Sequence, residues 1–259
     1  MISNLAYVHP DAQLGENVIV GPFTNIEADV KIGANTKIES NVTIMNGTEI
    51  GSGCHIFPGA VIGAVPQDLK YNGEDTKAIV GNNCVIREYV TINRGTTDKW
   101  ETRVGNNTLL MAYTHIGHDC IIGNHCILAN SAGVSGHVTI DDYAIIEGQV
   151  GISQFVHIGA YAFVAGRTGV RQNIPPFIKV ARDPLSFIGV NSIGMKRRGV
   201  PEQDIKNVES IYKKLYIYNK TIGKGIEDIT QNEPDSEIKT QILEFIKNSP
   251  GGIIKSPIK

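Results

Sequence analysis

Residues 104–170 read VGNNTL LMAYTH IGHDCI IGNHCI LANSAG VSGHVT IDDYAI IEGQVG ISQFVH IGAYAF VAGRTG V, and every block of six begins with an aliphatic residue. The same phase extends back to Val8, so the series has 28 positions, of which 25 are Ile, Leu or Val. The three exceptions, Asp68, Glu74 and Asp98, lie in two hydrophilic interruptions. A period of six fits neither a single helix nor a single strand, and it is typical of a hexapeptide-repeat β-solenoid.

A second column of small residues lies two positions before the aliphatic column. Alternate residues of a strand point to the same side, so both columns face inward, and one large with one small side chain suits a narrow lumen. Three short faces and three corners predict a triangular coil of three hexads, stacked on the next coil about 4.8 Å away by parallel strand pairing. Glycine often follows the aliphatic residue, as at Gly63, Gly105 and Gly117, and we expect a positive φ at these corners.

Two segments interrupt the hexads without shifting their phase, since Val80 and Val104 remain in the series. Residues 64–77 and 94–103 are therefore predicted to be external loops on an otherwise continuous solenoid. The pattern ends beyond Val170, where the chain continues into an Asn-Ile-Pro-Pro stretch. A different kind of structure is expected to follow.

We assign residues 1–190 to a parallel β-helix and residues 191–259 to a C-terminal α-helical domain. Pro201 with acidic neighbours predicts the start of an amphipathic helix, and the two glycines within 223–225 are expected to break it. Pro234 is expected to begin a further helix. These helices could cap the end of the solenoid or pack beside it.

The composition excludes several classes of protein. The chain has 259 residues with 41% hydrophobic content, which is ordinary for a globular protein, and it contains no apolar run long enough to cross a bilayer. Residues 1–4 lack the charged and apolar regions of a signal peptide, so we expect a cytoplasmic protein without stable membrane insertion. All four cysteines occupy the inward small column, where packing thiols are expected rather than disulfides or metal ligands.

The charges are distributed unevenly along the chain. Residues 1–165 hold 8 basic and 16 acidic side chains, a balance of −8, whereas residues 166–259 hold 16 basic and 10 acidic side chains, a balance of +6. A basic end on an acidic body suggests an acidic docking partner, although ordinary solvated helix faces would give the same balance. Nucleic acid is not favoured as a partner, because the basic region lacks interleaved aromatics and the whole chain is not basic.

The coil of three hexads converts sequence spacing into spatial neighbours. Gly136 is one coil beyond His118, and His137 is one coil beyond Asp119. The polar patch that results is expected to contain His115, His118, Asp119, His137 and Gln154. The missing side chain at Gly136 leaves a notch, where a backbone N–H could receive negative charge beside an imidazole base. No nucleophile is apparent, which favours direct transfer without a covalent enzyme intermediate.

Two other interpretations of the histidines stay open. Three imidazoles on a flat face could bind Zn²⁺, as in His-rich solenoid hydratases, or they could be ordinary polar side chains of a purely structural solenoid. A flat face cannot enclose a substrate, so a pocket needs a second wall. Residues 64–77, which contain Gln67, Asp68 and Lys70, or another subunit of a symmetric oligomer could supply it.

Six stretches of the chain resemble one known family. They are 67–71 (QDLKY), 91–96 (TINRGT), 115–120 (HIGHDC), 136–138 (GHV), 154–155 (QF) and 194–199 (GMKRRG). In combination they are similar to the UDP-N-acetylglucosamine O-acyltransferases, and the similarity covers essentially the whole chain. The related N-acyltransferases carry a uridine-binding domain before the solenoid, whereas the hexads here begin by Val8, which favours the O-acyltransferase.

The resemblance implies a homotrimer of left-handed parallel β-helices with active sites between neighbouring subunits. It implies transfer of an (R)-3-hydroxyacyl chain from acyl carrier protein to the 3-hydroxyl of UDP-N-acetylglucosamine, the first step of lipid A biosynthesis. In this role His118 is the general base, Asp119 its orienting carboxylate and the Gly136 amide the oxyanion donor. The acidic carrier protein would dock on the basic end of the chain, and we expect no metal and no cofactor.

The resemblance also assigns substrate contacts. The residues concerned are Gln67, Asp68, Lys70, His115, His137, Gln154, Asn191, Arg197 and Arg198. Gly166 falls where the family measures acyl length, and the missing side chain there predicts that a long chain is admitted. Two positions depart from the family pattern. Ser153 stands where His is frequent, which alters one polar contact, and Ile193 stands where Glu is common, which affects a contact to the nucleotide.

Overall fold

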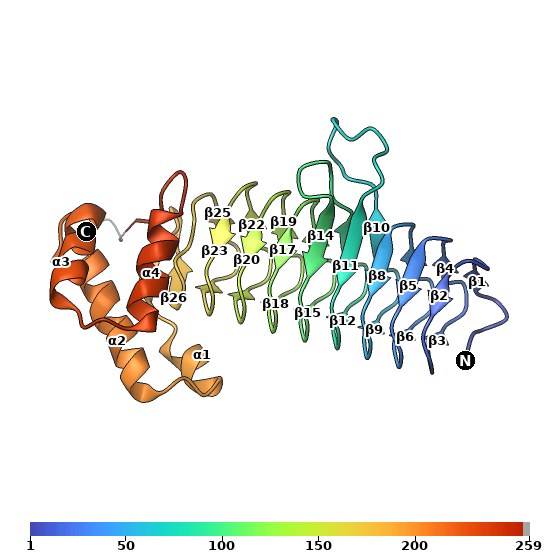
Figure 1. Cartoon of the computed structure of the whole chain (residues 1–259), viewed down its shortest axis with the longest axis horizontal. Coiled ribbons are helices and arrows are strands. Elements are labelled where there is room, and N and C mark those ends of the chain that lie inside the picture. The colour runs from blue at the N-terminus through green and yellow to red at the C-terminus, as the bar shows by residue number, and fades with distance from the viewer. Residues whose placement is uncertain (256–259) are drawn as a thin grey trace.

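The computed structural model describes residues 1–255 and shows a long solenoid of short strands followed by a group of helices (Figure 1). The strands form three sheets, which are the three faces of a prism. Face 1 contains β1 (Tyr7–Val8), β4 (Asn25–Ile26), β7 (Thr43–Ile44), β10 (Val61–Ala64), β13 (Thr91–Asn93), β16 (His115–Ile116), β19 (Gly133–Val134), β22 (Gly151–Ile152) and β25 (Gly169–Val170). Face 2 contains β2 (Gln13–Leu14), β5 (Val30–Ile32), β8 (Thr48–Ile50), β11 (Lys77–Val80), β14 (Glu101–Val104), β17 (Ile121–Ile122), β20 (Thr139–Ile140) and β23 (His157–Ile158). Face 3 contains β3 (Ile19–Val20), β6 (Lys37–Ile38), β9 (His55–Ile56), β12 (Val85–Ile86), β15 (Leu109–Leu110), β18 (Ile127–Leu128), β21 (Ile145–Ile146), β24 (Phe163–Val164), β26 (Ile178–Ala181) and β27 (Ser186–Val190).

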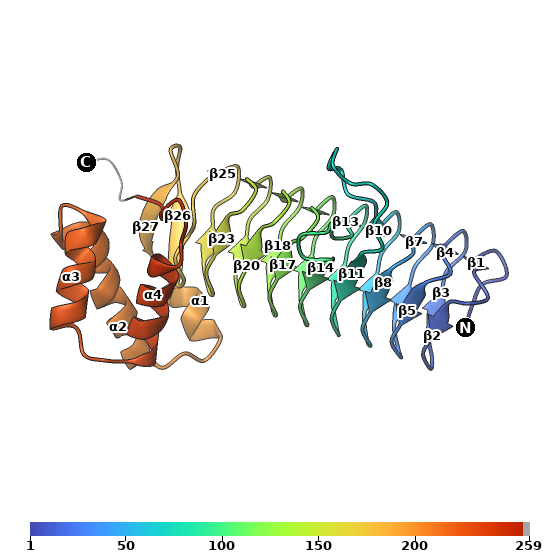
Figure 2. The same cartoon turned by 45° about the horizontal axis from the view of Figure 1, so that its top comes forward.

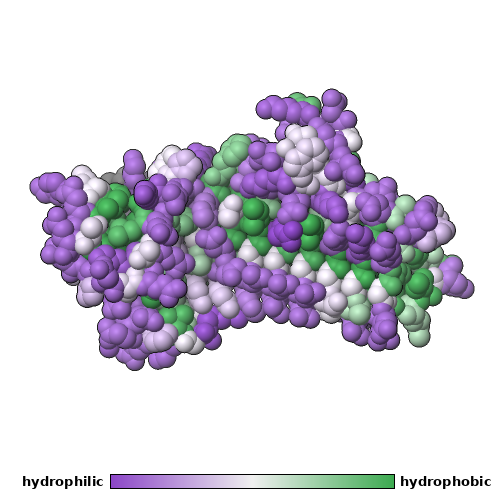
Figure 3. Space-filling model, in the orientation of Figure 1, coloured by the Kyte–Doolittle hydropathy of each residue, from purple (hydrophilic) through white to green (hydrophobic). Residues whose placement is uncertain are grey.

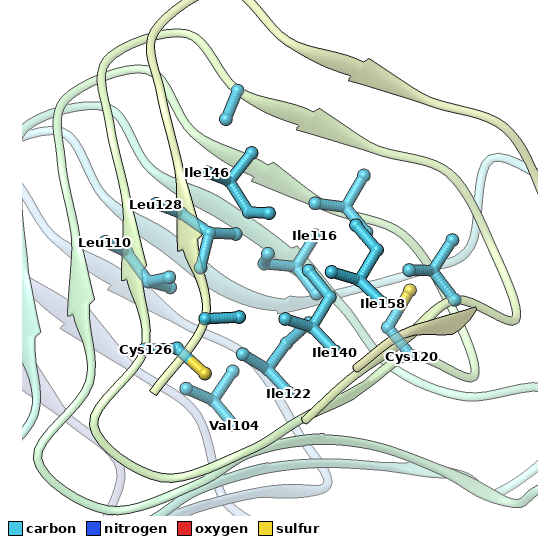
Figure 4. Close-up of a cluster of buried hydrophobic side chains, with 14 of the residues drawn as sticks. Val104, Leu110, Ile116, Cys120, Ile122, Cys126, Leu128, Ile140, Ile146 and Ile158 are labelled. Atoms are coloured by element: carbon cyan, nitrogen blue, oxygen red, sulfur yellow. The ribbon is translucent and has the colours of Figure 1, made fainter. Parts of the chain in front are cut away.

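Stacked strands pair in parallel and keep the aliphatic positions in register. Ile116 of β16 pairs with Val134 of β19, which lies three hexads further along the chain, as the triangular coil predicts. The aliphatic column fills the lumen, where Ile116, Ile140 and Leu128 are fully buried (Figure 4). This arrangement confirms the predicted fold class, a left-handed parallel β-helix followed by C-terminal helices.

The cysteines lie in the same lumen. All four are buried, and none forms a disulfide among the described residues, which confirms that they are packing thiols. Burial raises the pKa of the Cys120 thiol to about 12 and that of Cys126 to about 12, so both thiols stay protonated near neutral pH. Neither has the thiolate character that a nucleophile requires.

Two loops project from the solenoid between β10 and β11 and between β13 and β14 (Figures 1 and 2). Thr48 pairs with Ala78, five hexads later, and Lys77 pairs with Glu101, four hexads later. Compared with the regular spacing of three hexads, the first loop adds two hexads and the second adds one, so the phase survives. The second loop is shorter than the predicted 94–103, because Glu101 and the two residues after it pair with β11.

The glycines after the aliphatic positions serve a different purpose from the one expected. Gly105 and Gly117 do not have a positive φ. A positive φ occurs instead two residues after them, at Asn107 (φ 55°) and Asp119 (φ 58°). Gly63, with φ 83°, is an exception that fits the expectation. A Cβ at Gly105 would lie 2.5 Å from a backbone carbon of the next coil, and one at Gly117 would lie 2.8 Å from a backbone nitrogen. Glycine is therefore required at these positions by the close approach of stacked coils.

The end of the solenoid is covered by two further strands and the helices. β26 pairs in parallel with β24, and β27 folds back antiparallel on β26. The helices are α1 (Ser192–Arg197), α2 (Glu202–Lys213), the π-helix η1 (Lys214–Tyr218), α3 (Ile222–Asn232) and α4 (Glu237–Lys247). The division into domains at residues 190 and 191 stays a prediction, although strands end at Val190 and helices begin at Ser192.

The helices differ in detail from those predicted. Pro201 precedes α2 as expected, but Gly225 lies inside α3 rather than breaking a helix. A Cβ at Gly225 would lie 2.9 Å from the Cα of Leu215, so the glycine permits α3 to cross η1 closely. The last helix begins after Ser236, whose side chain accepts a hydrogen bond from the Lys239 N–H, slightly later than Pro234 suggested.

The surface of the molecule is mostly polar. Figure 3 shows hydrophilic side chains over the helices and the projecting loop, with a band of hydrophobic side chains along the middle of the solenoid. Among the described residues, no helix combines the length and the apolar character needed to span a bilayer.

Candidate active site

His118 and Asp119 form a buried pair at the corner between β16 of face 1 and β17 of face 2. The His118 Nδ1 donates to Asp119 Oδ2 at 2.7 Å, and the two side chains are 7% and 0% exposed. Asp119 adopts φ 58°, the left-handed conformation that turns the chain at this corner. Because Nδ1 is engaged by the carboxylate, the Nε2 of His118 is left as the proton acceptor.

The loop between β13 and β14 holds Asp119 in place. Its carboxylate accepts hydrogen bonds from the Thr96 N–H (2.9 Å), the Thr96 hydroxyl (2.7 Å) and the Lys99 N–H (3.1 Å). Burial alone would raise the pKa of Asp119, but the hydrogen bonds from Thr96 and His118 outweigh it and lower the pKa below its usual value. Asp119 is therefore ionised and able to orient His118.

His137 lies directly beside His118, one coil further along. Their rings meet edge to face, with centroids 4.8 Å apart and an interplanar angle of 89°. The His137 Nδ1 donates to Asp98 Oδ2 at 3.0 Å, and the other side of the ring stacks on Phe155 with centroids 4.5 Å apart. The site thus contains two His–Asp pairs with perpendicular rings.

Gly136 faces the free nitrogen of His118. A Cβ built on Gly136 would lie 2.5 Å from His118 Nε2, so only glycine leaves room for the imidazole in this position. Within residues 1–255, the N–H of Gly136 donates to no protein acceptor. Among the described residues, a backbone N–H and an imidazole nitrogen that have no hydrogen-bond partner therefore belong to two residues that pack against one another.

His115 and Gln154 lie at the edge of this cluster. The His115 Nδ1 is 2.7 Å from the Thr91 hydroxyl, and burial, with a smaller effect of His118, lowers the pKa of His115. Gln154 is exposed and makes no side-chain hydrogen bond with the described residues. A Cβ on Gly133 or on Gly151 would contact nothing within 4 Å, so the strip of face 1 beyond His115 is open.

The remaining predicted contact residues lie elsewhere in the single chain. Gln67 and Lys70 are exposed on the first loop, where Asp68 accepts a hydrogen bond from the Lys70 N–H at 3.0 Å. Asn191 is the N-cap of α1, and Arg198 lies over the ring of Tyr143 at 5.4 Å.

Asn191, Arg197 and Arg198, which lie in α1 or cap it, therefore gather at the corner between faces 2 and 3. Tyr143 lies there in a stack with His125 and Tyr161, whereas His118 lies at the corner between faces 1 and 2. Arg197 is exposed on the same short helix. Two corners of one prism cannot face a common ligand, so Asn191, Arg197 and Arg198 do not converge with His118 within one subunit.

Three side chains of the cluster could hold a metal ion. One ligand atom from each of His118, Asp119 and His137 lies within 4.8 Å of the others. However, the Nδ1 atoms of both histidines are already at hydrogen-bond distance from carboxylates. A single metal would have to replace these contacts or use Nε2 atoms of perpendicular rings.

The second loop contributes residues to the site that the sequence did not predict. Thr96, Asp98 and Lys99 hold Asp119 and His137, whereas the hexad pattern marks Asp98 only as an exception. A signal was present: the polar interruption falls in the coil that immediately precedes His115 and His118.

The repeat, the geometry and the comparisons with known proteins agree on a class. Residues 29–64 and 101–136 match the family described as bacterial transferase hexapeptide (six repeats). The fold and the imidazole cluster thus define a hexapeptide-repeat acyltransferase. Residues 173–254 match the family described as "Udp N-acetylglucosamine O-acyltransferase; Domain 2".

Individual relatives are similar over nearly the full length. The acyl-[acyl-carrier-protein]–UDP-N-acetylglucosamine O-acyltransferase of Sulfurihydrogenibium sp. (strain YO3AOP1) is 52% identical over 249 residues, covering 96% of this chain and 92% of that protein. The enzyme of the same name from Saccharophagus degradans is 43% identical and covers 96% and 97%. The solved UDP-N-acetylglucosamine acyltransferase of Bacteroides fragilis superposes with a TM-score of 0.96 at 45% identity, covering 98% and 100%. The chain belongs to the UDP-N-acetylglucosamine O-acyltransferase family.

Proposed function

We propose that the chain transfers an (R)-3-hydroxyacyl group from acyl carrier protein to the 3-hydroxyl of UDP-N-acetylglucosamine, the first step of lipid A biosynthesis. The observation that carries the proposal is the free Nε2 of His118 next to the unengaged N–H of Gly136. The relatives support the substrates, since their names specify an acylated carrier protein and this nucleotide sugar. The carrier protein is acidic, and the segment 166–259 with its balance of +6 would receive it.

The steps of the proposed reaction follow from the positions of His118 Nε2 and the Gly136 N–H. His118 Nε2 takes the proton of the sugar 3-hydroxyl as the hydroxyl oxygen bonds to the thioester carbonyl carbon. The carbonyl electrons move to its oxygen, and that oxyanion accepts a hydrogen bond from the Gly136 N–H. Collapse of the tetrahedral intermediate re-forms the carbonyl and expels the carrier thiolate, which takes the proton from His118. A general base contributes about 10²–10⁴ in rate and an oxyanion donor about 10²–10³.

The complete pocket requires a second subunit. His118 lies at the corner between faces 1 and 2, whereas Asn191, Arg197 and Arg198 lie at the corner between faces 2 and 3, so one subunit does not bring them together. In a homotrimer, the corner between faces 1 and 2 of one subunit lies against the corner between faces 2 and 3 of its neighbour. In that arrangement Gln67, Asp68 and Lys70 of the exposed loop, together with Asn191, Arg197 and Arg198, contact the substrates. The hydrophobic band on the solenoid supports such a contact (Figure 3).

The acyl chain is accommodated along the open part of face 1. Gly133 and Gly151 leave space beyond His115, and the backbone at Gly166 offers no side chain at the position proposed to measure chain length. His137 and Gln154 contact the substrate at the start of this strip. Relative to the family pattern, Ser153 alters one polar contact and Ile193 alters a nucleotide contact, and neither departure involves His118.

One assay tests the proposal directly. UDP-N-acetylglucosamine is incubated with a series of 3-hydroxyacyl and unsubstituted acyl carrier protein donors, and the O-acylated nucleotide sugar is quantified. We expect transfer from hydroxylated donors, loss of transfer in His118→Ala, and unchanged transfer in the control His9→Ala, which removes an imidazole from the first coil. Absence of product with every donor would refute the function, and near-normal turnover of His118→Ala would remove His118 from its role.

The setting of the reaction belongs to the same proposal. Enzyme, carrier protein and nucleotide sugar are expected to meet in the cytoplasm, and the trimer is expected to form without metal or other cofactor. Sedimentation equilibrium tests the trimer, for which we expect a particle of three times 28.1 kDa. Cell fractionation tests the cytoplasmic location.

A further inference from the structure

We propose that Asp98 is a positioning residue for His137 in this transfer reaction, an inference that rests on the proposed function. The carboxylate accepts a hydrogen bond from His137 Nδ1 at 3.0 Å, and the two residues are 39 positions apart in the chain. Asp98 belongs to the loop between β13 and β14, whose neighbouring residues Thr96 and Lys99 hold Asp119. One loop therefore orients both imidazoles of the site, the first through Asp119 and the second directly.

The backbone of the loop fixes where the Asp98 carboxylate lies. The Asp98 N–H donates to the Thr96 hydroxyl at 3.3 Å, and the Trp100 N–H donates to the Thr96 carbonyl at 2.8 Å. The Lys99 ammonium donates to the main-chain carbonyl of Asp119 at 3.0 Å. These contacts join the loop to the adjacent coil, so the carboxylate of Asp98 can reach one coil further.

Asp98 is the partner of His137, even though a second carboxylate is close. Asp119 Oδ2 lies 3.9 Å from His137 Nδ1, beyond hydrogen-bond distance, and already accepts from His118 Nδ1 and the Thr96 hydroxyl. The charged and titratable groups that face His137 among the described residues are thus Asp98, Asp119 and His118. Of these, Asp98 is the group that can fix its tautomer.

The contact leaves Nε2 of His137 available to a substrate. With Nδ1 bound to Asp98, the ring is held between the edge contact with His118 and the stack on Phe155. The His137 side chain is 14% exposed, whereas the Asp98 side chain is 58% exposed. A solvent-facing carboxylate that orients a nearly buried imidazole is the arrangement by which an outer partner sets the hydrogen-bonding direction of an inner one.

A double-mutant cycle tests the inference. Asp98→Ala, His137→Ala and the double variant are compared in steady-state transfer with each substrate varied. We expect Asp98→Ala to lower kcat/KM about tenfold, mainly through KM, which is the order for loss of an orienting hydrogen bond to a charged group. In the His137→Ala background the same change is expected to alter kcat/KM less than about twofold. Asp98→Glu should restore part of the loss.

The control and the contrary results are specific. Asp141→Ala removes a partly exposed carboxylate that contacts His157 at 2.9 Å outside the site, and it should leave the kinetics unchanged. An equal loss for Asp98→Ala in both backgrounds, or no loss in the wild-type background, overturns the inference.

An activity-independent measurement separates this inference from the proposed function. ¹⁵N shifts of the His137 imidazole should report a protonated Nδ1 in the wild-type chain and a mixture of tautomers in Asp98→Ala. A wild-type His137 protonated only on Nε2 overturns the inference, whether or not the chain transfers acyl groups. A chain that shows the expected shifts but no transfer contradicts the proposed function alone.

Discussion

Replacing Gly136 by alanine places a methyl group against the His118 imidazole, which we propose as the general base. The added Cβ would lie 2.5 Å from Nε2 and 2.6 Å from Cε1 of His118, whereas ordinary contact begins at 3.4 Å. The ring must retreat by about 0.9 Å, the difference between 3.4 and 2.5 Å. A misplacement of about 1 Å can reduce a reaction rate about 10²-fold. The backbone N–H remains in the variant, so the loss reports the position of the base.

The assay is kcat for transfer from the preferred acyl carrier protein donor, with thermal unfolding measured in parallel. We expect kcat to fall about 10²-fold while the unfolding temperature changes little, since the backbone at Gly136 does not require positive φ. Gly223→Ala is the control, because its Cβ would also meet nothing within 4 Å and the residue lies in α3, outside the site. A kcat within about threefold of the wild-type value would show that His118 and Gly136 do not act on one carbonyl.

Three further predictions concern pH, chain length and metal. Burial, and to a smaller extent His118, lowers the pKa of His115, so below its usual pKa of 6.5 the unfolded chain binds more protons and stability falls as the pH drops. His115→Gln should reduce this fall in the free energy of unfolding, measured with urea between about pH 5 and 7. An unchanged dependence of the free energy on pH would contradict the lowered pKa of His115. Gly166→Met should shift the preferred donor to a shorter acyl chain, and an unchanged profile across the donor series would place the length determinant elsewhere. Dialysis against a chelator should leave transfer intact because carboxylates engage both Nδ1 atoms of the imidazole pair; loss of activity that Zn²⁺ restores would support the hydratase-like interpretation.

The regular part of the fold could be predicted because one rule governs it. A period of six with aliphatic residues places Ile116 under Val134, and the same arithmetic places His137 beside Asp119 and Gly136 over His118. Each of these predictions depends only on the constant length of a coil. Inward and outward positions alternate along a strand, so a wrong register would expose the whole lumen.

The loops and the helices could not be predicted in the same way. The contact from Asp98 to His137 depends on the path of the loop backbone, which no period describes. Gly225 was predicted to break a helix, and that prediction was wrong. The glycine is needed because α3 crosses η1 closely, and this contact exists only in the packed structure. The convergence of Arg198 and His118 on one substrate, which we propose, needs a neighbouring subunit, and the spacing within one chain carries no information about it.

The way in which the two loops leave and rejoin the solenoid has a consequence for how such a chain can change. Strand register at β11 and β14 is set by the coils above and below, and not by the residues between the strands. A segment can therefore be inserted, shortened or exchanged at these two exits while the scaffold on either side stays as it was. New substrate preferences can be acquired by grafting at the first exit without any redesign of the buried repeat, whereas a graft at the second exit must keep the contacts of Thr96, Asp98 and Lys99.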